Sequence, residues 1–250
     1  MFKMVRQMTI DNEYFTYKRL DWDSSKLGLE TYELLLKQNL KTVTMNELKS
    51  IWNNADLLYI KNNTKNRINS KFIGEETSAI IYDTNISFVL NLKDFVQFEI
   101  EDYSNFTYAI ESELNIELND FINFNDSRFM KDVQLNNRIG VNIYLEWIIN
   151  SFNLERKKFF TIRKKNEVLG FILYQTYDDY LTIELISVKT GYYNQKIGSH
   201  LIANFKKIAS DKQLHYLYVG TQISNINAIN FYIKNKFKVK DTTDIYHWWK

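Results

Sequence analysis

Short strand-like runs of apolar residues recur along the first hundred residues, separated by more polar stretches. Runs rich in β-branched and aromatic residues are separated by polar turns, and one run with apolar residues at helical spacing predicts a helix at residues 45–55. The predicted strands lie at residues 15–20, 32–36, 57–60, 78–82 and 87–92. Because strands and a helix are mixed in this way, we expect a small α/β module.

The middle of the chain predicts a second and larger domain. One of its helices carries Ile139, Ile143 and Trp147 at four-residue spacing, which is the stripe that a helix buries against a core. Short polar turns join the later strands and predict antiparallel pairing. The expected elements are a strand at 96–101, helices at 108–121 and 135–152, and strands at 158–163, 168–177 and 180–188. We therefore expect an N-terminal module at 1–102 and a second domain at 103–250.

A polar loop follows the last of these strands and leads into another helix. The loop region holds Gly191 and Gly198, two of the chain's 7 glycines, and apolar residues recur at helical spacing from about Ser199. A helix N-terminus presents unpaired N–H groups and a partial positive charge, and glycine lets an anion approach the backbone. The loop is therefore a candidate pyrophosphate site; an ordinary turn between a strand and a helix is the alternative.

The next segment adds a strand at 214–222 and a helix that begins at Asn225 and ends before Phe237. The order of strand, glycine-containing loop, helix, strand and Asn-x-x-Ala-x-x-x-Tyr resembles the Gcn5-related N-acetyltransferase (GNAT) superfamily. This resemblance implies a GNAT fold, an α/β fold in which helices flank a mixed central sheet, and acetyl-CoA as co-substrate. In that family the loop wraps the coenzyme A pyrophosphate, the Asn reaches the pantetheine arm and the Tyr protonates the departing thiolate.

The resemblance assigns roles to individual residues. Asn225 would contact pantetheine, and Tyr232 would be the general acid. Backbone N–H groups of Ile186, Ser187 and Val188 would hold pantetheine and polarise the thioester carbonyl. Tyr232 lies about two helical turns after Asn225, so both face the same side, but a helical tyrosine is also commonly a core residue. The loop residues implied to bind the pyrophosphate are Tyr193, Asn194, Gln195, Lys196, Ile197, Gly198 and Ser199.

Two lysines depart from the family pattern. Lys196 stands where the loop usually has its first glycine, and Lys236 stands where a glycine usually precedes the final Phe. A second register, with Gln195 as the first polar residue and Gly198 as the first glycine, would place His200 at a small-residue position. We favour the first register because it puts apolar residues on the buried positions of the helix. The ammonium of Lys196 then either pairs with a phosphate or stays solvated.

Short runs elsewhere in the chain carry a narrower resemblance. They are Val-Gly-Thr-Gln at 219–222, Tyr-His-Trp-Trp at 246–249, Ser-Arg-Phe at 127–129 and Leu-Asp-Trp-Asp-Ser at 20–24. These runs are similar to the dTDP-fucosamine acetyltransferase branch, whose members N-acetylate a nucleotide-linked amino-dideoxysugar. The implied acceptor is a dTDP-linked hexose with its amine at C3 or C4, used for bacterial surface polysaccharide such as lipopolysaccharide O-antigen. The N-terminal module would then resemble a partial GNAT domain.

Two residues from these runs are candidates for the acceptor site. Arg128 carries a planar fork of donors that suits a substrate phosphate, and an exposed arginine at a helix cap is the alternative. Trp22 lies between two aspartates in a predicted turn. It would line a sugar or nucleotide pocket, or else belong to a surface turn whose Asp and Ser side chains bind the backbone.

The implied reaction is direct attack of the acceptor amine on the acetyl thioester. Tyr232 can supply a proton to the thiolate, because a phenol has an ordinary pKa near ~10 and a thiol one near ~8.5. Glu184, on the strand before the loop, is the candidate general base, or else a strand residue that faces solvent. One rival keeps the fold but acetylates a peptide or small amine. Another is a decayed domain that binds acyl-CoA without catalysis.

Composition limits the remaining classes. The 32 basic and 30 acidic residues leave a net charge of +2 and are interspersed, so neither nucleic acid nor a membrane is an expected partner. The chain has no cysteine and its 3 histidines are dispersed, so we expect no metal. No apolar run reaches about 18 residues. We expect a cytoplasmic enzyme whose partners are coenzyme A and a nucleotide sugar; a homodimer is left open.

Overall fold

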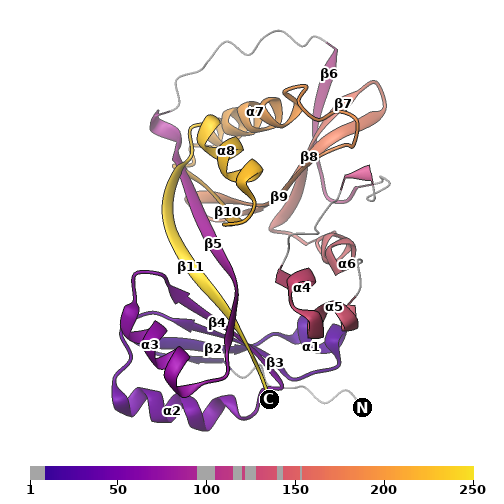
Figure 1. Ribbon diagram of the computed structural model, residues 1–250. Helices are drawn as coiled ribbons and strands as arrows, with labels where there is room; N and C mark the ends of the chain where they lie inside the picture. The colour runs from indigo at the N-terminus through magenta and orange to yellow at the C-terminus, as the bar shows by residue number, and fades with distance from the viewer. Residues whose placement is uncertain (1–8, 95–104, 115–119, 122–127, 140–142, 153) are drawn as a thin grey trace. The chain divides into compact units, whose positions relative to one another are not determined.

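The computed structural model of the protein describes residues 9–94, 105–114, 120–121, 128–139, 143–152 and 154–250 (Figure 1). The chain forms two compact units, each assembled from separate stretches of sequence. The first unit is Met1–Ile86, Asp126–Gly140 and Asp241–Lys250, and the second is Ser87–Asn125 and Val141–Lys240. The boundary predicted between residues 102 and 103 lies outside the described residues and stays a prediction.

The first unit is a mixed sheet covered by helices. Its strand order is β1-β2-β3-β4-β11-β5, with β3 and β4 parallel and β11 antiparallel to β4. Strands β5 and β11 contribute residues to both units. The strands are β1 (Thr9–Asp11), β2 (Phe15–Arg19), β3 (Thr31–Leu36), β4 (Leu57–Asn63), β5 (Ile80–Asn91) and β11 (Lys238–Trp249). The helices are α1 (Asp21–Leu27), α2 (Thr42–Trp52), α3 (Arg67–Glu76), α4 (Arg128–Lys131) and α5 (Val133–Ile139).

Strand β4 explains why this sheet needs helices on both faces. Its first four residues are all buried, and successive side chains point to opposite faces of a strand. Leu58 and Ile60 join a core with residues of α2 and α3, such as Leu48 and Phe72. Leu57 and Tyr59 join a second core with Leu27 of α1 and Leu135 of α5.

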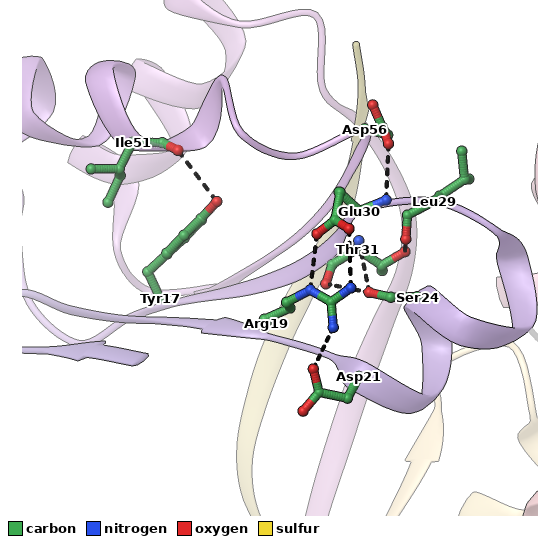
Figure 2. Close-up of polar contacts among 9 residues, drawn as sticks. All are labelled: Tyr17, Arg19, Asp21, Ser24, Leu29, Glu30, Thr31, Ile51 and Asp56. Atoms are coloured by element: carbon green, nitrogen blue, oxygen red, sulfur yellow. Dashed lines mark hydrogen bonds and ion pairs between the residues drawn. The ribbon is translucent and has the colours of Figure 1, made fainter. Parts of the chain in front are cut away.

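The stretch predicted as a turn at 21–25 is in fact helix α1. Asp21 and Asp23 lie in its first turn, where carboxylates favour the positive end of the helix dipole, and Gly28 ends the helix at φ 65°. Figure 2 shows how α1 is held: Arg19 binds Glu30 through two hydrogen bonds of 2.9 and 3.0 Å and also pairs with Asp21. The turn prediction was therefore wrong at this site.

The second unit is also built on a mixed sheet. Its strand order is β5-β10-β9-β8-β7-β6, with β6 to β9 antiparallel and β9 parallel to β10. The strands beyond β5 are β6 (Phe106–Glu111), β7 (Lys157–Lys164), β8 (Glu167–Thr176), β9 (Tyr180–Val188) and β10 (Tyr216–Gln222). The helices are the 3₁₀ helix η1 (Leu92–Asp94), α6 (Ile143–Ile149), α7 (Ile197–Asp211) and α8 (Ile226–Lys234).

Helix α7 packs tightly on one face of this sheet. Phe205 lies edge-on to Tyr174 of β8 at 4.8 Å, and side chains at the start of α7 lie over Gly170. A Cβ on Gly170 would lie 2.9 Å from the carbonyl oxygen of Ser187 and 3.0 Å from Leu201. On the other face Phe159 and Phe171 form a core with Ile148 of α6. The mixed α/β class predicted from the sequence is confirmed.

Several predicted elements differ from the structure. The helix expected at 108–121 is wrong at its start, because β6 pairs with β7 and stacks Tyr108 on Phe160 at 5.8 Å. Helices α5 and α6 lie within or next to the helix expected at 135–152, and residues 140–142 between them lie outside the described residues. The strands expected at 78–82 and 87–92 are the single strand β5. The strand expected at 96–101 lies outside the described residues. Within the described part of the chain, none of the helices combines the length and apolar character that a membrane span requires.

Candidate functional site

Strands β9 and β10 stop pairing halfway along β9. The parallel ladder joins residues 180–183 of β9 to residues 216–219 of β10 and ends with Ile183 opposite Val219. Strand β9 nevertheless continues to Val188, and Ile186 to Val188 stay paired with β8 on the other side. The half of β9 beyond Ile183 therefore has an open edge toward β10, where backbone N–H and C=O groups can bind a ligand.

A β-bulge marks the point where the opening starts. Leu173 of β8 pairs with Leu185 and the next residue, Tyr174, pairs with Ile183, so Glu184 is the extra residue on β9. Bulges of this kind bend a strand and redirect side chains, and they are common next to active sites. The residues of the predicted pantetheine contact, Ile186, Ser187 and Val188, begin two residues after Glu184.

The loop after β9 leads into the N-terminus of α7. Three of its residues have positive φ: Gly191 at 90°, Asn194 at 62° and Lys196 at 59°. Lys196 is the N-cap residue of α7, and its carbonyl oxygen accepts the N–H of His200. A 15-residue helix that begins at the end of the open strand directs its unpaired N–H groups toward the same region.

The two lysines that depart from the family pattern share one backbone conformation. Lys196 has φ 59° and Lys236 has φ 71°, the left-handed region that glycine adopts at little cost. At both positions the lysine therefore adopts the backbone geometry that would suit the glycine usual in the GNAT superfamily.

Gly198 lies in the first turn of α7, against helix α8. A Cβ built there would lie 3.1 Å from Phe231 Cε2 and 3.7 Å from Val188 Cγ2. The side chains nearest to Gly198 are thus those of α8 and β9. Its small size allows the start of α7 to pack against Phe231.

Asn225 is the N-cap residue of α8. Its side-chain oxygen accepts the N–H of Ala228 at 3.0 Å, which fixes the side chain at the start of the helix. The oxygen is therefore used within the protein, and the amide NH₂ group is the part of Asn225 that suits a ligand carbonyl.

Tyr232 lies in an aromatic cluster on the buried face of α8. Only 4% of the residue is exposed, and its ring centroid is 5.4 to 5.7 Å from those of Phe88, Phe231 and Phe237. Burial raises the pKa of the Tyr232 phenol well above its usual range, so the hydroxyl carries its proton at neutral pH. Both readings of this tyrosine, a core residue and a proton donor, remain compatible with this environment.

Glu184 forms an ion pair with Lys157 of β7. Lys157 Nζ lies 2.6 Å from Glu184 Oε2, and both side chains are more than four-fifths buried. The same ammonium lies 5.3 Å from the ring centroid of Trp147. The Glu184 carboxylate is therefore held in place on the sheet face that also carries α6. For Glu184 to act as the general base, the acceptor amine must compete with Lys157 for its carboxylate.

The two acceptor candidates belong to the first unit. Arg128 is the first residue of α4, and its side chain lies outside what the structure describes. Trp22 lies in α1, and its buried indole nitrogen has no hydrogen-bond partner among the described residues. An unpaired buried donor is costly, so the indole N–H of Trp22 is a candidate to donate a hydrogen bond to a bound ligand.

Sequence reasoning missed the partners that fix the site. The hydroxyl of Thr190 donates to the carbonyl oxygen of Asp120 at 2.8 Å, and Ser187 donates to that of Phe121. Lys157 was also missed. These contacts join residues far apart in sequence, and the local pattern around each residue holds no signal for them.

Comparisons with known proteins agree with this geometry. Residues 121–237 match the acetyltransferase (GNAT) family. A curated relative, the spore coat polysaccharide biosynthesis protein SpsD of Bacillus subtilis (strain 168), is 28% identical over 126 residues. That match covers 50% of this chain and 44% of SpsD, so the chain matches less than half the length of its relative.

Solved structures share the fold over nearly the whole chain. A conserved protein of unknown function from Staphylococcus epidermidis ATCC 12228 is 13% identical with a TM-score of 0.63, covering 99% of this chain and 96% of that one. A GCN5-related N-acetyltransferase from Sphaerobacter thermophilus is 9% identical with a TM-score of 0.60, covering 94% and 76%. The GNAT fold and the resemblance to the GNAT superfamily predicted from the sequence are confirmed by the match of residues 121–237 to the acetyltransferase (GNAT) family and by these shared folds.

Proposed function

We propose that this protein transfers the acetyl group of acetyl-CoA to the amine of a dTDP-linked amino-dideoxyhexose. The observation that carries the proposal is the open edge of β9 beyond Ile183, which lies next to the N-terminus of α7. An extended pantetheine arm can add to such an edge as a further strand would, while the pyrophosphate is held by helix N–H groups.

Residues of the second unit would share the binding of coenzyme A. The loop from Tyr193 to Ser199 would bind the pyrophosphate mainly through backbone N–H groups, and Asn225 would donate its NH₂ group to pantetheine. The backbone of Ile186, Ser187 and Val188 would hold the arm and polarise the thioester carbonyl. This placement brings the acetyl group toward the bulge at Glu184, where the strand opens.

The proposed chemistry is direct acetyl transfer. The acceptor nitrogen attacks the thioester carbonyl carbon, a C–N bond forms, and the C–S bond breaks. The departing thiolate takes the proton of Tyr232, whose burial keeps it protonated. The amine loses a proton to Glu184, directly or through water. Tyr232 recovers its proton from solvent after the product leaves.

The choice of acceptor rests on two supports. The branch resemblance implies a dTDP-linked sugar, and the matched relative SpsD is named for polysaccharide biosynthesis. Trp22 and Arg128 would contact the sugar or its nucleotide. The product would be a 3- or 4-acetamido sugar nucleotide for surface polysaccharide, and the reaction would take place in the cytoplasm, where acetyl-CoA is made.

The experiment that tests this proposal follows thiol release from acetyl-CoA with a panel of acceptors. The panel holds dTDP-linked 3-amino and 4-amino sugars, the same sugars without nucleotide, small polyamines and peptides. We expect kcat/KM for one dTDP-linked sugar to exceed that of its free sugar by at least about 10²-fold, because nucleotide binding positions the amine. Equal values for the two would remove the nucleotide-sugar acceptor. If none of the acceptors in the panel leads to thiol release, the result favours the rival in which the protein binds acyl-CoA without catalysis.

A further inference from the structure

Four tyrosines gather on one face of the second unit, where β9 and β10 begin. Tyr177 stacks on Tyr180 with 4.5 Å between ring centroids and 15° between ring planes. Tyr180 meets Tyr218 edge-on at 5.1 Å, and Tyr218 lies 6.1 Å from Tyr216. The ammonium of Lys240 lies 4.3 Å from the Tyr218 ring centroid. We call Tyr177, Tyr180, Tyr216, Tyr218 and Lys240 the tyrosine platform.

The strand register places the platform on the face opposite α7. Leu181 and Ile183 of β9 are buried on the α7 side, because Ile183 pairs with Tyr174, which packs on Phe205 of that helix. Side chains alternate along a strand, so Tyr180 points to the other face. Tyr216 pairs with Tyr180 in register, which puts the β10 tyrosines on this same face.

Glu184 lies on the same face as the platform. Its partner Lys157 pairs in register with Gln175, which pairs in turn with Thr182 of β9, two residues from Tyr180. Tyr180 is four residues before Glu184, which corresponds to about 13 Å along a strand. The platform thus begins roughly one nucleotide's length from the carboxylate where the amine would lose its proton.

The platform's chemistry suits a nucleotide. None of its tyrosines is fully buried, and Tyr216 is 36% exposed. A nucleobase can stack on a tyrosine ring because every base has a π face. A lysine next to such a ring supplies a positive charge for a phosphate group.

We infer that the tyrosine platform binds the nucleoside diphosphate part of the acceptor, with the thymine base on the tyrosines and a phosphate near Lys240. This inference rests on the proposed function and adds to it the residues that select a nucleotide-linked sugar. The base and the amine lie at opposite ends of such an acceptor. One molecule can therefore occupy the platform with its base while its amine reaches Glu184.

The test is a calorimetric titration of the intact protein with dTDP at saturating coenzyme A, so that the loop before α7 is already occupied. The wild-type protein should bind dTDP. Tyr218→Leu should weaken that binding by about tenfold or more, whereas Tyr218→Phe should bind within about twofold of wild type, because stacking needs the ring and not the hydroxyl. The matched control is Tyr14→Leu, since Lys41 lies 5.1 Å from the Tyr14 ring centroid in the first unit. This control should leave dTDP binding unchanged.

A second variant keeps the inference testable if Tyr218→Leu does not fold. Lys240→Gln changes an exposed side chain, and it should weaken dTDP binding and reduce its salt dependence. The inference is overturned if wild type does not bind dTDP, or if a Tyr218→Leu protein with normal coenzyme A affinity and Lys240→Gln both bind it as wild type does. Turnover of dTDP-linked sugar is scored separately. Platform-dependent dTDP binding without turnover would contradict the proposed function and not this inference.

Discussion

The ammonium of Lys157 donates a hydrogen bond to the carboxylate of Glu184, with 2.6 Å between Nζ and Oε2. This contact joins β7 to the bulge of β9 across the intervening strand β8. It fixes a charged oxygen at the place where β9 and β10 stop pairing. A base that is held in this way needs little reorganisation when an amine arrives.

Replacing Glu184 tests whether the carboxylate takes the amine's proton. Glu184→Gln keeps the size of the side chain and removes its charge, so we expect kcat to fall by about 10²-fold while coenzyme A affinity is kept. The matched control is Glu33→Gln, which removes the carboxylate of the 2.5 Å Lys61–Glu33 ion pair of the first unit. Steady-state kinetics of the two variants give the comparison. Similar kcat values for Glu184→Gln and Glu33→Gln would assign Glu184 a structural role only.

The proton on Tyr232 is the second catalytic feature open to test. Tyr232→Phe keeps the ring among Phe88, Phe231 and Phe237 and deletes only the hydroxyl, so kcat should fall by about 10²-fold or more. Because burial raises the pKa of the phenol, its acid form persists as pH rises, and loss of this proton should cause no decline in wild-type kcat below about pH 10. A folded Tyr232→Phe protein with normal kcat would make solvent the proton source.

Gly198 connects coenzyme A binding to the packing of two helices. A branched side chain there must displace Phe231, so Gly198→Val should lower the free energy of unfolding by about 1–3 kcal/mol and strongly weaken coenzyme A binding. Gly74→Ala is the control. Gly74 lies inside α3 with open space around its Cβ position, and the change should stabilise the protein by about 0.5–1 kcal/mol. Denaturant unfolding and calorimetry measure both effects, and unchanged coenzyme A affinity in Gly198→Val would refute the loop assignment.

A buried carboxylate predicts how the stability of the first unit depends on pH. Asp132 caps α5 and binds His247 at 2.7 Å and Trp249 at 3.1 Å. Burial alone raises the pKa of Asp132, but the hydrogen bonds from His247 and Trp249 outweigh it and hold the pKa below its ordinary value. The stabilisation is therefore present above about pH 4, the ordinary range for Asp, and is lost as pH falls through the lowered pKa.

Asp132→Asn should therefore destabilise the protein by about 3 kcal/mol at neutral pH, since it removes the buried charge and replaces one of its two acceptor oxygens with an NH₂ donor. The difference in free energy of unfolding between wild type and variant should shrink below about pH 4. Urea unfolding at a series of pH values measures it. A difference that stays constant from pH 6 to pH 3 would show that the charge of Asp132 contributes nothing.

The sequence predicted the elements that carry the site more closely than those around it. Strand β9, the loop, α7 and α8 begin within about two residues of their predicted positions, because apolar spacing and turn residues mark them locally. Strand β6 was missed because Tyr108 and Ile110 fit a helix or a strand equally well. Its pairing with β7, some fifty residues later in the chain, decides the matter.

The candidate residues show the same division. The left-handed conformations of Lys196 and Lys236 could be expected, because both stand where the resembling family usually has glycine. The ion pair of Glu184 could not be expected, since it depends on the register of three strands. Local pattern therefore located the loop and the helix N-terminus, whereas tertiary pairing determines which side chains meet there.

Amide hydrogen exchange with and without coenzyme A tests most directly the claim that the open edge of β9 is the coenzyme site. Coenzyme A should slow exchange at the amides of Ile186, Ser187 and Val188 and of the loop leading into α7, with little change across the first unit. Protection confined to other segments, or none at all under conditions where calorimetry shows coenzyme A to be bound, would contradict it.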